Sequence, residues 1–182
     1  MLRPPVVTDK LVWCQQTRYP VSVDNSNNDD LWTRGGAWVL AQFPLTALAL
    51  FAARIGPTLP AVVQVPGRWI GLALFLAGSL LLLAGVLRLG PRLTPFPKPG
   101  ADHQLVQGGV YGLARHPIYG GGVVAIVGWA LLNGGWLGLL AAAGMAVFFN
   151  AKAGVEERWL SAQFPEYAAY RRRVKKLIPF VY

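Results

Sequence analysis

Cysteine and histidine, the residues that build disulfides and most metal centres, are scarce in this sequence. The 182 residues include one cysteine, Cys14, and two histidines, His103 and His116. A lone cysteine excludes a disulfide within the chain, and two distant histidines without a cysteine pair do not have the spacing of a zinc site. Neither a Ser/His/Asp set nor an H-x-E motif with paired cysteines is visible. We therefore expect no bound metal.

Charged residues, and acidic ones above all, are also few. Only 14% of the residues are charged and 54% are hydrophobic, which is too apolar for an ordinary soluble domain of this length. The 17 Lys and Arg exceed the 8 Asp and Glu and give a net charge of +9. A soluble protein could use this excess to bind nucleic acid. The long apolar runs favour a bilayer with anionic lipids as the partner instead, and no nucleic acid.

The apolar residues are concentrated in runs of membrane-spanning length. Segments 35–53 and 69–87 each contain nineteen residues without a charge, and arginines flank both. As helices they would be about 28 Å long, close to the hydrocarbon thickness of a bilayer, roughly 30 Å. We expect Pro44 to kink the first helix without excluding it, since neighbouring helices can satisfy the freed carbonyl.

Two shorter apolar runs, 118–132 and 136–149, lie on either side of Asn133-Gly134-Gly135. Each has nearly the length of a re-entrant or buried helix, but the tight turn between them predicts an antiparallel helical hairpin. A soluble helical core would show polar faces at helical spacing, which these runs lack. The sequence therefore predicts an all-α integral membrane protein with about four transmembrane helices. Small residues should allow the hairpin to pack closely: Gly120, Gly121, Gly122, Gly128, Gly138, Ala142 and Gly144.

The distribution of the cations predicts the orientation. With four spans, both termini and the loop 88–117 share one side of the membrane and hold all of the 17 Lys and Arg except Arg54 and Arg68. Positive charge accumulates on the cytoplasmic side of membrane proteins. We therefore expect a multi-pass protein of a bacterial inner membrane or an ER-type membrane, with both termini and this loop cytoplasmic.

Three regions follow one another along the chain. Residues 1–34 are polar and turn-rich, lack the continuous apolar core of a cleavable signal peptide, and predict a flexible leader. Residues 35–89 hold two spans joined by a loop with several prolines, which we interpret as a plain connector. Residues 90–182 contain the hairpin and begin with the proline-rich stretch 91–100, which should be extended.

Beyond the hairpin the sequence becomes polar. The last apolar helix should continue from 136 through 163, and a second short helix is expected over 167–176. On this short helix Tyr167, Tyr170 and Val174 share one face. Its arginines and lysines lie mostly on the other face, which suits contact with anionic lipids.

Ionisable groups gather in two segments. Both histidines lie within 102–119 and all three glutamates lie within 156–166, and the two segments flank the hairpin on the predicted cytoplasmic side. A membrane-embedded protein has few polar groups, so their clustering marks a candidate active site.

The same segments carry a recognisable pattern. The stretch His103-Gln104-Leu105-Val106-Gln107-Gly108-Gly109-Val110-Tyr111, followed by Arg115-His116-Pro117-Ile118-Tyr119, resembles the signature of the isoprenylcysteine carboxyl methyltransferase family and of the wider phospholipid methyltransferase-like membrane enzymes. The resemblance covers roughly residues 90–182, and the N-terminal half contributes hydrophobicity only. Its second half follows the hairpin with Glu156-Glu157, Leu160, Phe164, Tyr167, Tyr170, Val174 and Ile178-Pro179.

The resemblance implies an S-adenosylmethionine-dependent methyltransferase, with the cofactor in a cytoplasmic pocket of the C-terminal segments and a lipid-like acceptor that enters from the bilayer. It implies catalytic roles for Lys152, which would face the acceptor, and for Glu157. The acceptor group stays open between a carboxylate, as in isoprenylcysteine O-methylation, and an amine, because Lys152 stands where relatives often have Arg and offers only a point charge. The implied cofactor-binding residues are His103, Gln104, Leu105, Val106, Tyr111, His116, Pro117, Ile118, Tyr119 and Glu156.

Two other classes of function are considered beside the methyltransferase. A membrane reductase of the sterol-reductase type has a related C-terminal architecture and would use NADPH, although this chain is short for it. A non-catalytic membrane scaffold would bind neither cofactor. Binding of S-adenosylhomocysteine, of NADPH, or of neither distinguishes the three.

Overall fold

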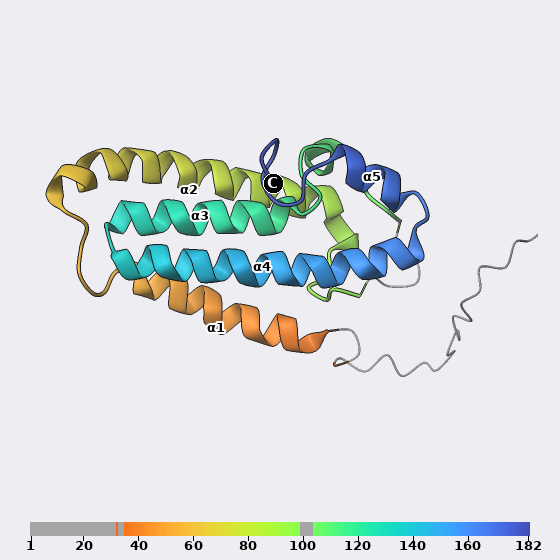
Figure 1. The fold of residues 1–182 in the computed structure, drawn as a ribbon, viewed down its shortest axis with the longest axis horizontal. Coiled ribbons are helices and arrows are strands. Elements are labelled where there is room, and N and C mark those ends of the chain that lie inside the picture. Colours follow the sequence, from red (N-terminus) through yellow and green to blue (C-terminus); the bar gives the residue numbers. More distant parts are fainter. Residues whose placement is uncertain (1–31, 33–34, 99–103) are drawn as a thin grey trace, which may run out of the picture.

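The computed structural model describes Trp32, residues 35–98 and residues 104–182, and this part of the chain is helical without a strand (Figure 1). The predictions for Cys14, for the leader and for His103 lie outside the described residues. The α-helices are α1 (Gly36–Ala52), α2 (Ala61–Leu89), α3 (Pro117–Asn133), α4 (Trp136–Gln163) and α5 (Tyr167–Arg173), with 3-10 turns at Gly90–Arg92 and Gly109–Gly112.

The four long helices lie side by side in the order α2, α3, α4, α1, and successive helices run in opposite directions (Figure 1). The start of α1, the end of α2, the start of α3, the end of α4 and α5 therefore share one end of the bundle. The all-α prediction is confirmed for the described residues. The predicted hairpin is also present, since Gly134 ends α3 with a φ of 69° and α4 begins two residues later.

The boundary of one predicted helix was wrong. Helix α2 begins at Ala61 rather than at 69, so Pro66 lies inside the helix and not in a plain connector. Pro66 is the sixth residue of the helix, so it removes the backbone hydrogen bond to the carbonyl four residues earlier, while its fixed φ still fits the helical backbone. The side chain of Gln64 also donates a hydrogen bond to the Leu59 carbonyl, 2.9 Å away, which stabilises this first turn.

Glycines bring α2 and α3 into backbone contact. A Cβ atom added to Gly78 would lie 2.4 Å from the Ala125 nitrogen, and one added to Gly128 would lie 2.3 Å from the Phe75 nitrogen. Small residues permit this approach, which increases van der Waals contact between helices in a bilayer. The prediction of small packing surfaces is thus confirmed at Gly128, but it was wrong at Gly144, where no atom lies within 4 Å of an added Cβ.

The outer surface of the bundle is apolar. Two helical segments, Ala61–Arg92 and Trp136–Gln163, are long and apolar enough to cross a membrane, and the helices Gly36–Ala52 and Pro117–Asn133 are apolar but shorter. Large hydrophobic side chains on the outward faces are exposed, including Phe43, Leu76, Leu80, Leu83 and Val147. Exposure of this many large apolar side chains is unusual on a soluble monomer and supports a membrane protein.

The C-terminal segment folds back onto the start of α3. Helix α5 ends at Arg173, earlier than predicted, because Val174 is extended and Lys175 pairs with Ala114. Backbone hydrogen bonds fix this pairing, with the His116 nitrogen donating to the Lys176 carbonyl at 2.9 Å. The predicted proline-rich extended stretch was likewise wrong at its start, since Pro91 lies in a 3-10 turn before the chain extends at Leu93.

Candidate active site

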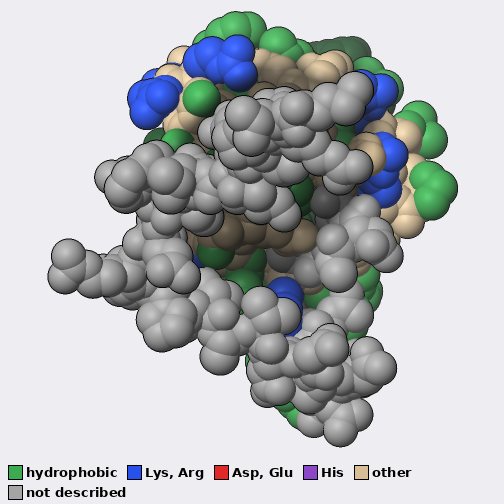
Figure 2. All heavy atoms as spheres, turned by 90° about the vertical axis from the view of Figure 1, so that its right-hand side faces the viewer, with side chains coloured by type: hydrophobic (Ala, Val, Ile, Leu, Met, Phe, Trp, Pro, Cys, Tyr) green, Lys and Arg blue, Asp and Glu red, His purple; other side chains and the backbone are tan. Residues whose placement is uncertain are grey.

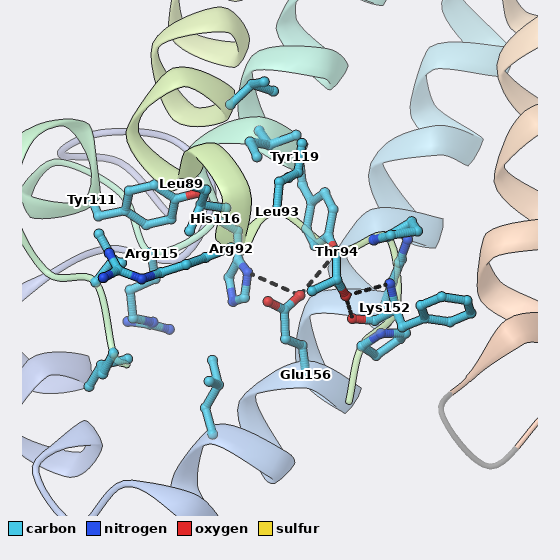
Figure 3. Close-up of a pocket in the computed structure, with 18 of the residues that line it drawn as sticks. Leu89, Arg92, Leu93, Thr94, Tyr111, Arg115, His116, Tyr119, Lys152 and Glu156 are labelled. Atoms are coloured by element: carbon cyan, nitrogen blue, oxygen red, sulfur yellow. Dashed lines mark hydrogen bonds and ion pairs between the residues drawn. The ribbon is translucent and has the colours of Figure 1, made fainter. Parts of the chain in front are cut away.

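A cavity of about 380 Å³ lies at the end of the bundle where α2 ends and α3 begins (Figure 3). This volume lies in the range of small-molecule binding sites. Residues 90–182 supply most of the lining, and helices α1 and α2 add Gln42, Val86 and Leu89. The walls are mainly aliphatic and aromatic, so each polar group among them narrows the kind of ligand that fits.

Glu156 is the one carboxylate among the described residues that lines this cavity. The Tyr119 hydroxyl donates a hydrogen bond to its Oε2 atom at 2.9 Å, and His116 Nδ1 lies 3.7 Å from the same oxygen (Figure 3). Within the described residues no donor contacts Oε1, and the side chain keeps 26% of its exposure. Glu156 is therefore held in one position with an oxygen available to a ligand.

A stack of rings forms one wall of the site. The rings of His116 and Tyr119 are almost parallel, at an angle of 5° with centroids 5.5 Å apart. Tyr119 stacks in turn on Phe149, with centroids 5.0 Å apart. Pro117 is fully buried and is the first residue of α3, so His116 lies directly before the helix that carries Tyr119. The stack offers a flat surface for an aromatic or apolar ligand group.

Glu157 contacts the other nitrogen of His116 and does not line the cavity. Its Oε1 atom lies 3.3 Å from His116 Nε2 and accepts a hydrogen bond from Arg115 Nε at 2.8 Å. Arg115 also donates to the carbonyls of Arg171 and Val174. These contacts tie α3, α4 and the C-terminal segment together around His116.

Lys152 places a positive charge inside the cavity wall. Only 1% of the residue is exposed, its Nζ atom donates to Gln42 Oε1 at 2.5 Å, and it lies 5.3 Å from the centre of the Tyr119 ring. An ammonium group has three donors, and the described residues accept from one of them. A buried cation with donors to spare favours a ligand that carries an acceptor or a negative charge.

Three tyrosines close the cavity near α5. Burial, with the charge of Glu156 second, raises the pKa of Tyr111, and burial likewise raises the pKa of Tyr170. Both phenols therefore stay protonated at neutral pH, and Tyr170 donates to the Tyr111 carbonyl at 2.6 Å. The Tyr167 hydroxyl is buried and has no hydrogen-bond partner among the described residues. Burial, with the charge of Glu157 second, raises the pKa of Tyr167, so this phenol also stays protonated.

The structure brings most of the predicted site residues together. Among the predicted set, the cavity is lined by Gln104, Leu105, Val106, Tyr111, His116, Ile118, Tyr119, Lys152 and Glu156. Pro117 and Glu157 lie outside its lining, and His103 lies outside the described residues.

Sequence reasoning missed other groups that line the cavity, namely Gln42, Arg92, Thr94 and Arg115. Arg115 stands in the quoted motif beside His116, so the motif could have indicated it. Arg92 donates to Gln104 Oε1 at 3.4 Å, and only the fold shows that these two meet. The described residues contain no group of three or more His, Cys, Asp or Glu that could hold a metal ion.

Comparison with known proteins shows several relatives. The chain is 32% identical over 115 residues to the cobalt-zinc-cadmium resistance protein CzcN of Cupriavidus metallidurans, a match that covers 62% of this chain and 52% of the relative. It is 31% identical over 131 residues to protein-S-isoprenylcysteine O-methyltransferase B of Arabidopsis thaliana, covering 66% of each. It is 34% identical over 118 residues to the nickel-cobalt-cadmium resistance protein NccN of Alcaligenes xylosoxydans xylosoxydans, covering 64% of this chain and 54% of the relative.

The chain thus spans between about half and two thirds of the length of these relatives. The sequence profile of the phospholipid methyltransferase family matches residues 66–167, which is more than half of the chain and includes the hairpin and Glu156. The predicted resemblance is confirmed, and neither the reductase nor the scaffold alternative is favoured. The chain belongs to the phospholipid methyltransferase family.

Proposed function

We propose that the protein is an S-adenosylmethionine-dependent membrane methyltransferase that acts on a hydrophobic or lipid-like acceptor. The observation that carries this proposal is the arrangement of Glu156, Tyr119 and His116 in a cavity whose lining comes from both sides of the hairpin. Membership of a methyltransferase family supplies the reaction class. The exposed apolar surface of the bundle supports an acceptor that dissolves in the bilayer.

The groups in the cavity fit this cofactor. It combines an ammonium, a carboxylate, a sulfonium and an aromatic base, and supplies an electrophilic methyl group when bound. The available oxygen of Glu156 suits the ammonium, and Arg92 is a cation that lines the cavity and suits the carboxylate. The buried Tyr167 hydroxyl, which has no partner within the described part of the chain, can donate to a ligand oxygen. We propose that Gln104, Leu105, Val106, Tyr111, Ile118 and Tyr119 form the surrounding walls.

Lys152 would hold the acceptor. Its ammonium lies among apolar and aromatic groups, where an anionic acceptor is bound more strongly than in water. This favours a carboxylate, whose negative charge the ammonium can pair with, over an amine, which must be uncharged to accept a methyl group and gains no such pairing. Methyl transfer to a carboxylate needs no covalent intermediate, so alignment of the two reactants and exclusion of water would account for catalysis.

We propose that Glu157 acts through His116 and does not touch the reactants. Its contact with Nε2 orients the imidazole, so that Nδ1 faces Glu156. Glu157→Gln should change the imidazole nitrogen chemical shifts of His116 and weaken S-adenosylhomocysteine binding roughly tenfold, while Glu157→Asp retains both in part. With two histidines in the chain, His116→Ala assigns the signals. Unchanged nitrogen shifts in Glu157→Gln would contradict this role.

We also propose that all four long helices span the bilayer, with both termini and the cavity cytoplasmic. The described cations at the far end of the bundle are Arg54 and Arg68, and the others lie toward the cavity end, as the positive-inside rule requires. Cys14 can be replaced and single cysteines placed at Thr58 and at Gln107 for labelling in intact cells. Labelling of Thr58→Cys alone by an impermeant reagent is expected, and the reverse pattern would overturn the orientation.

Calorimetric titration of the detergent-purified protein with S-adenosylhomocysteine tests the proposed function. We expect micromolar binding, and no binding of NADPH. A panel of acceptors with labelled S-adenosylmethionine then follows, in which a prenylated N-acetylcysteine presents a carboxylate and phosphatidylethanolamine presents an amine. Absence of S-adenosylhomocysteine binding in folded protein would refute the methyltransferase, and methylation of the amine alone would refute the proposed acceptor class.

A further inference from the structure

A second cavity, of about 440 Å³, lies beside the first on the side of α5. It is formed by the residues 171–176, by the C-terminal residues Val181 and Tyr182, and by the Arg115–Glu157 pair. Within the described residues Arg115 is the one side chain that lines both cavities, so the two are neighbours but separate. Of this lining, the proposed methyl transfer uses Glu157 alone, as the partner of His116.

Positive charge dominates the second cavity. Its described lining contains six Lys and Arg and one acidic side chain, Glu157, which Arg115 already neutralises. Lys176 is engaged with Asn150, and Arg173 with Gln107. The side chains left without a partner in the described part of the chain are exposed: Arg171, Arg172 and Lys175. Cations this close repel one another unless an anion lies between them, so the cavity is suited to an anionic group.

An exposed apolar turn adjoins these cations. Residues 177–182 form a tight turn in which the Leu177 nitrogen donates to the Tyr182 carbonyl at 2.7 Å. Phe180 adopts a φ of 65°, which is uncommon for a residue with a side chain, and is 82% exposed, while Val181 is 71% exposed. Soluble proteins rarely hold neighbouring large apolar side chains in water in this way, whereas interfacial segments insert them into a bilayer.

The position of the turn matches a membrane surface. The Leu177 carbonyl packs on Gly120, where an added Cβ would lie 1.9 Å from it, so the turn lies against the first residues of α3. In Figure 1 the C-terminal turn is set back along the bundle from α5, toward its middle. The apolar turn therefore lies deeper along the helix axes than α5 does. Figure 2 looks onto this end of the bundle and shows Lys and Arg side chains around its described rim.

We propose that the second cavity binds the phosphate of an anionic phospholipid headgroup, with Phe180 and Val181 inserted beside it at the boundary of headgroups and acyl chains. Cations that surround a phosphate, next to apolar side chains that contact acyl chains, distinguish a lipid from a free phosphate ion. The proposal concerns a lipid that is bound but not methylated, and it does not depend on the cofactor.

Native mass spectrometry of the full chain tests this site. The protein is titrated in detergent with dioleoylphosphatidylglycerol, and with dioleoylphosphatidylcholine for comparison. We expect retention of phosphatidylglycerol in preference to phosphatidylcholine, and an affinity for phosphatidylglycerol about 30-fold lower in the double variant Arg172→Gln/Lys175→Gln. The control Arg68→Gln/Arg158→Gln removes the same charge from exposed positions outside the cavity and should leave the affinity within about twofold.

Further measurements distinguish a lipid from free inorganic phosphate, and distinguish a failure of this proposal from a failure of the methyltransferase proposal. Inorganic phosphate at 20 mM should not displace phosphatidylglycerol. The double variant Phe180→Ser/Val181→Ser should bind phosphatidylglycerol more weakly, without a change in the melting temperature of the protein. Equal retention of both lipids, an unchanged affinity in Arg172→Gln/Lys175→Gln, or displacement by inorganic phosphate would overturn the proposal. S-adenosylhomocysteine binding is measured on the same samples, so that a failure of the methyltransferase proposal is seen separately.

Discussion

The end of the bundle away from the cavity and the end that contains it are built differently. At the far end, backbone groups meet directly: the Leu59 nitrogen donates to the Gly134 carbonyl at 2.7 Å, and Gly138 packs on Ala53. At the cavity end the C-terminal segment also pairs with the start of α3 through its backbone, but charged side chains join the parts in addition, with the Arg115–Glu157 pair at 2.8 Å.

This difference shows where the chain carries function. Bringing ionisable groups together in a membrane protein is costly unless they pair or bind a ligand, and close backbone packing alone would have joined the helices at less cost. The far end is joined mainly by close backbone packing. Substitutions at the cavity end should therefore change ligand binding more than stability, and substitutions at the far end should do the reverse.

The largest effect is expected for Glu156→Gln. The substitution keeps the shape of the side chain but removes the charge that would hold the cofactor ammonium. Loss of a hydrogen bond between charged groups costs about 2–3 kcal/mol, so S-adenosylhomocysteine affinity should fall roughly 100-fold in calorimetry. Glu166→Gln, an exposed position on the same side of the hairpin, is the control. Equal losses in both variants would mean that net charge, and not this site, governs binding.

A substitution at the far end should lower the stability of the protein rather than its affinity for ligands. In Gly138→Ala the added Cβ would lie 2.7 Å from the Ala53 Cα atom, so the helices must move apart. Overpacking of this kind costs about 1–3 kcal/mol and should lower the melting temperature by roughly 3–10 °C, with cofactor affinity unchanged below the transition.

Gly144→Ala is the matched control for this prediction, because Gly144 lies on the same helix with no atom within 4 Å of an added Cβ. Its melting temperature should be unchanged or slightly higher, since alanine is the better helix former. If both variants lost stability equally, the close contact at Gly138 would not be what stabilises the far end.

Lys152→Gln should separate acceptor binding from cofactor binding. Without the ammonium, an acceptor carboxylate loses a charged partner, and the KM for the acceptor should rise about tenfold. S-adenosylhomocysteine affinity should stay within about twofold, because Glu156 remains in place. Lys175→Gln, outside this cavity, controls for the loss of a cation. A lower KM in Lys152→Gln would instead favour an amine acceptor.

Most of the helices could be predicted from the sequence, but some of their boundaries could not. The apolar runs and the Asn133-Gly134-Gly135 turn predicted α3 and α4, because length, hydrophobicity and turn residues act locally. The start of α2 was missed because Pro66 has the appearance of a helix breaker. The end of α5 was missed because the pairing of Lys175 with Ala114 is a tertiary contact that no local pattern encodes.

The site was predictable as a set of segments but less so in its geometry. Gln42 lies within an apolar run, and only the packing of α1 on α4 brings it to Lys152. Glu156 was predicted to bind the cofactor and Glu157 to be catalytic, both at one site, yet successive residues of a helix point about 100° apart, so they face different nitrogens of His116. Helix periodicity alone could have separated these two carboxylates.

The smallest effect is expected for Tyr119→Phe, which tests how Glu156, the carboxylate that lines the first cavity, is positioned. The ring stack between His116 and Phe149 should persist, and only the 2.9 Å hydrogen bond to Glu156 is removed. A single such bond is worth about 1 kcal/mol, so S-adenosylhomocysteine affinity should fall roughly fivefold. Tyr182→Phe, which removes an exposed hydroxyl at the second cavity, should leave it unchanged. A loss in Tyr119→Phe as large as in Glu156→Gln would mean that Glu156 cannot hold its position without this hydroxyl, since the carboxylate itself would still be present.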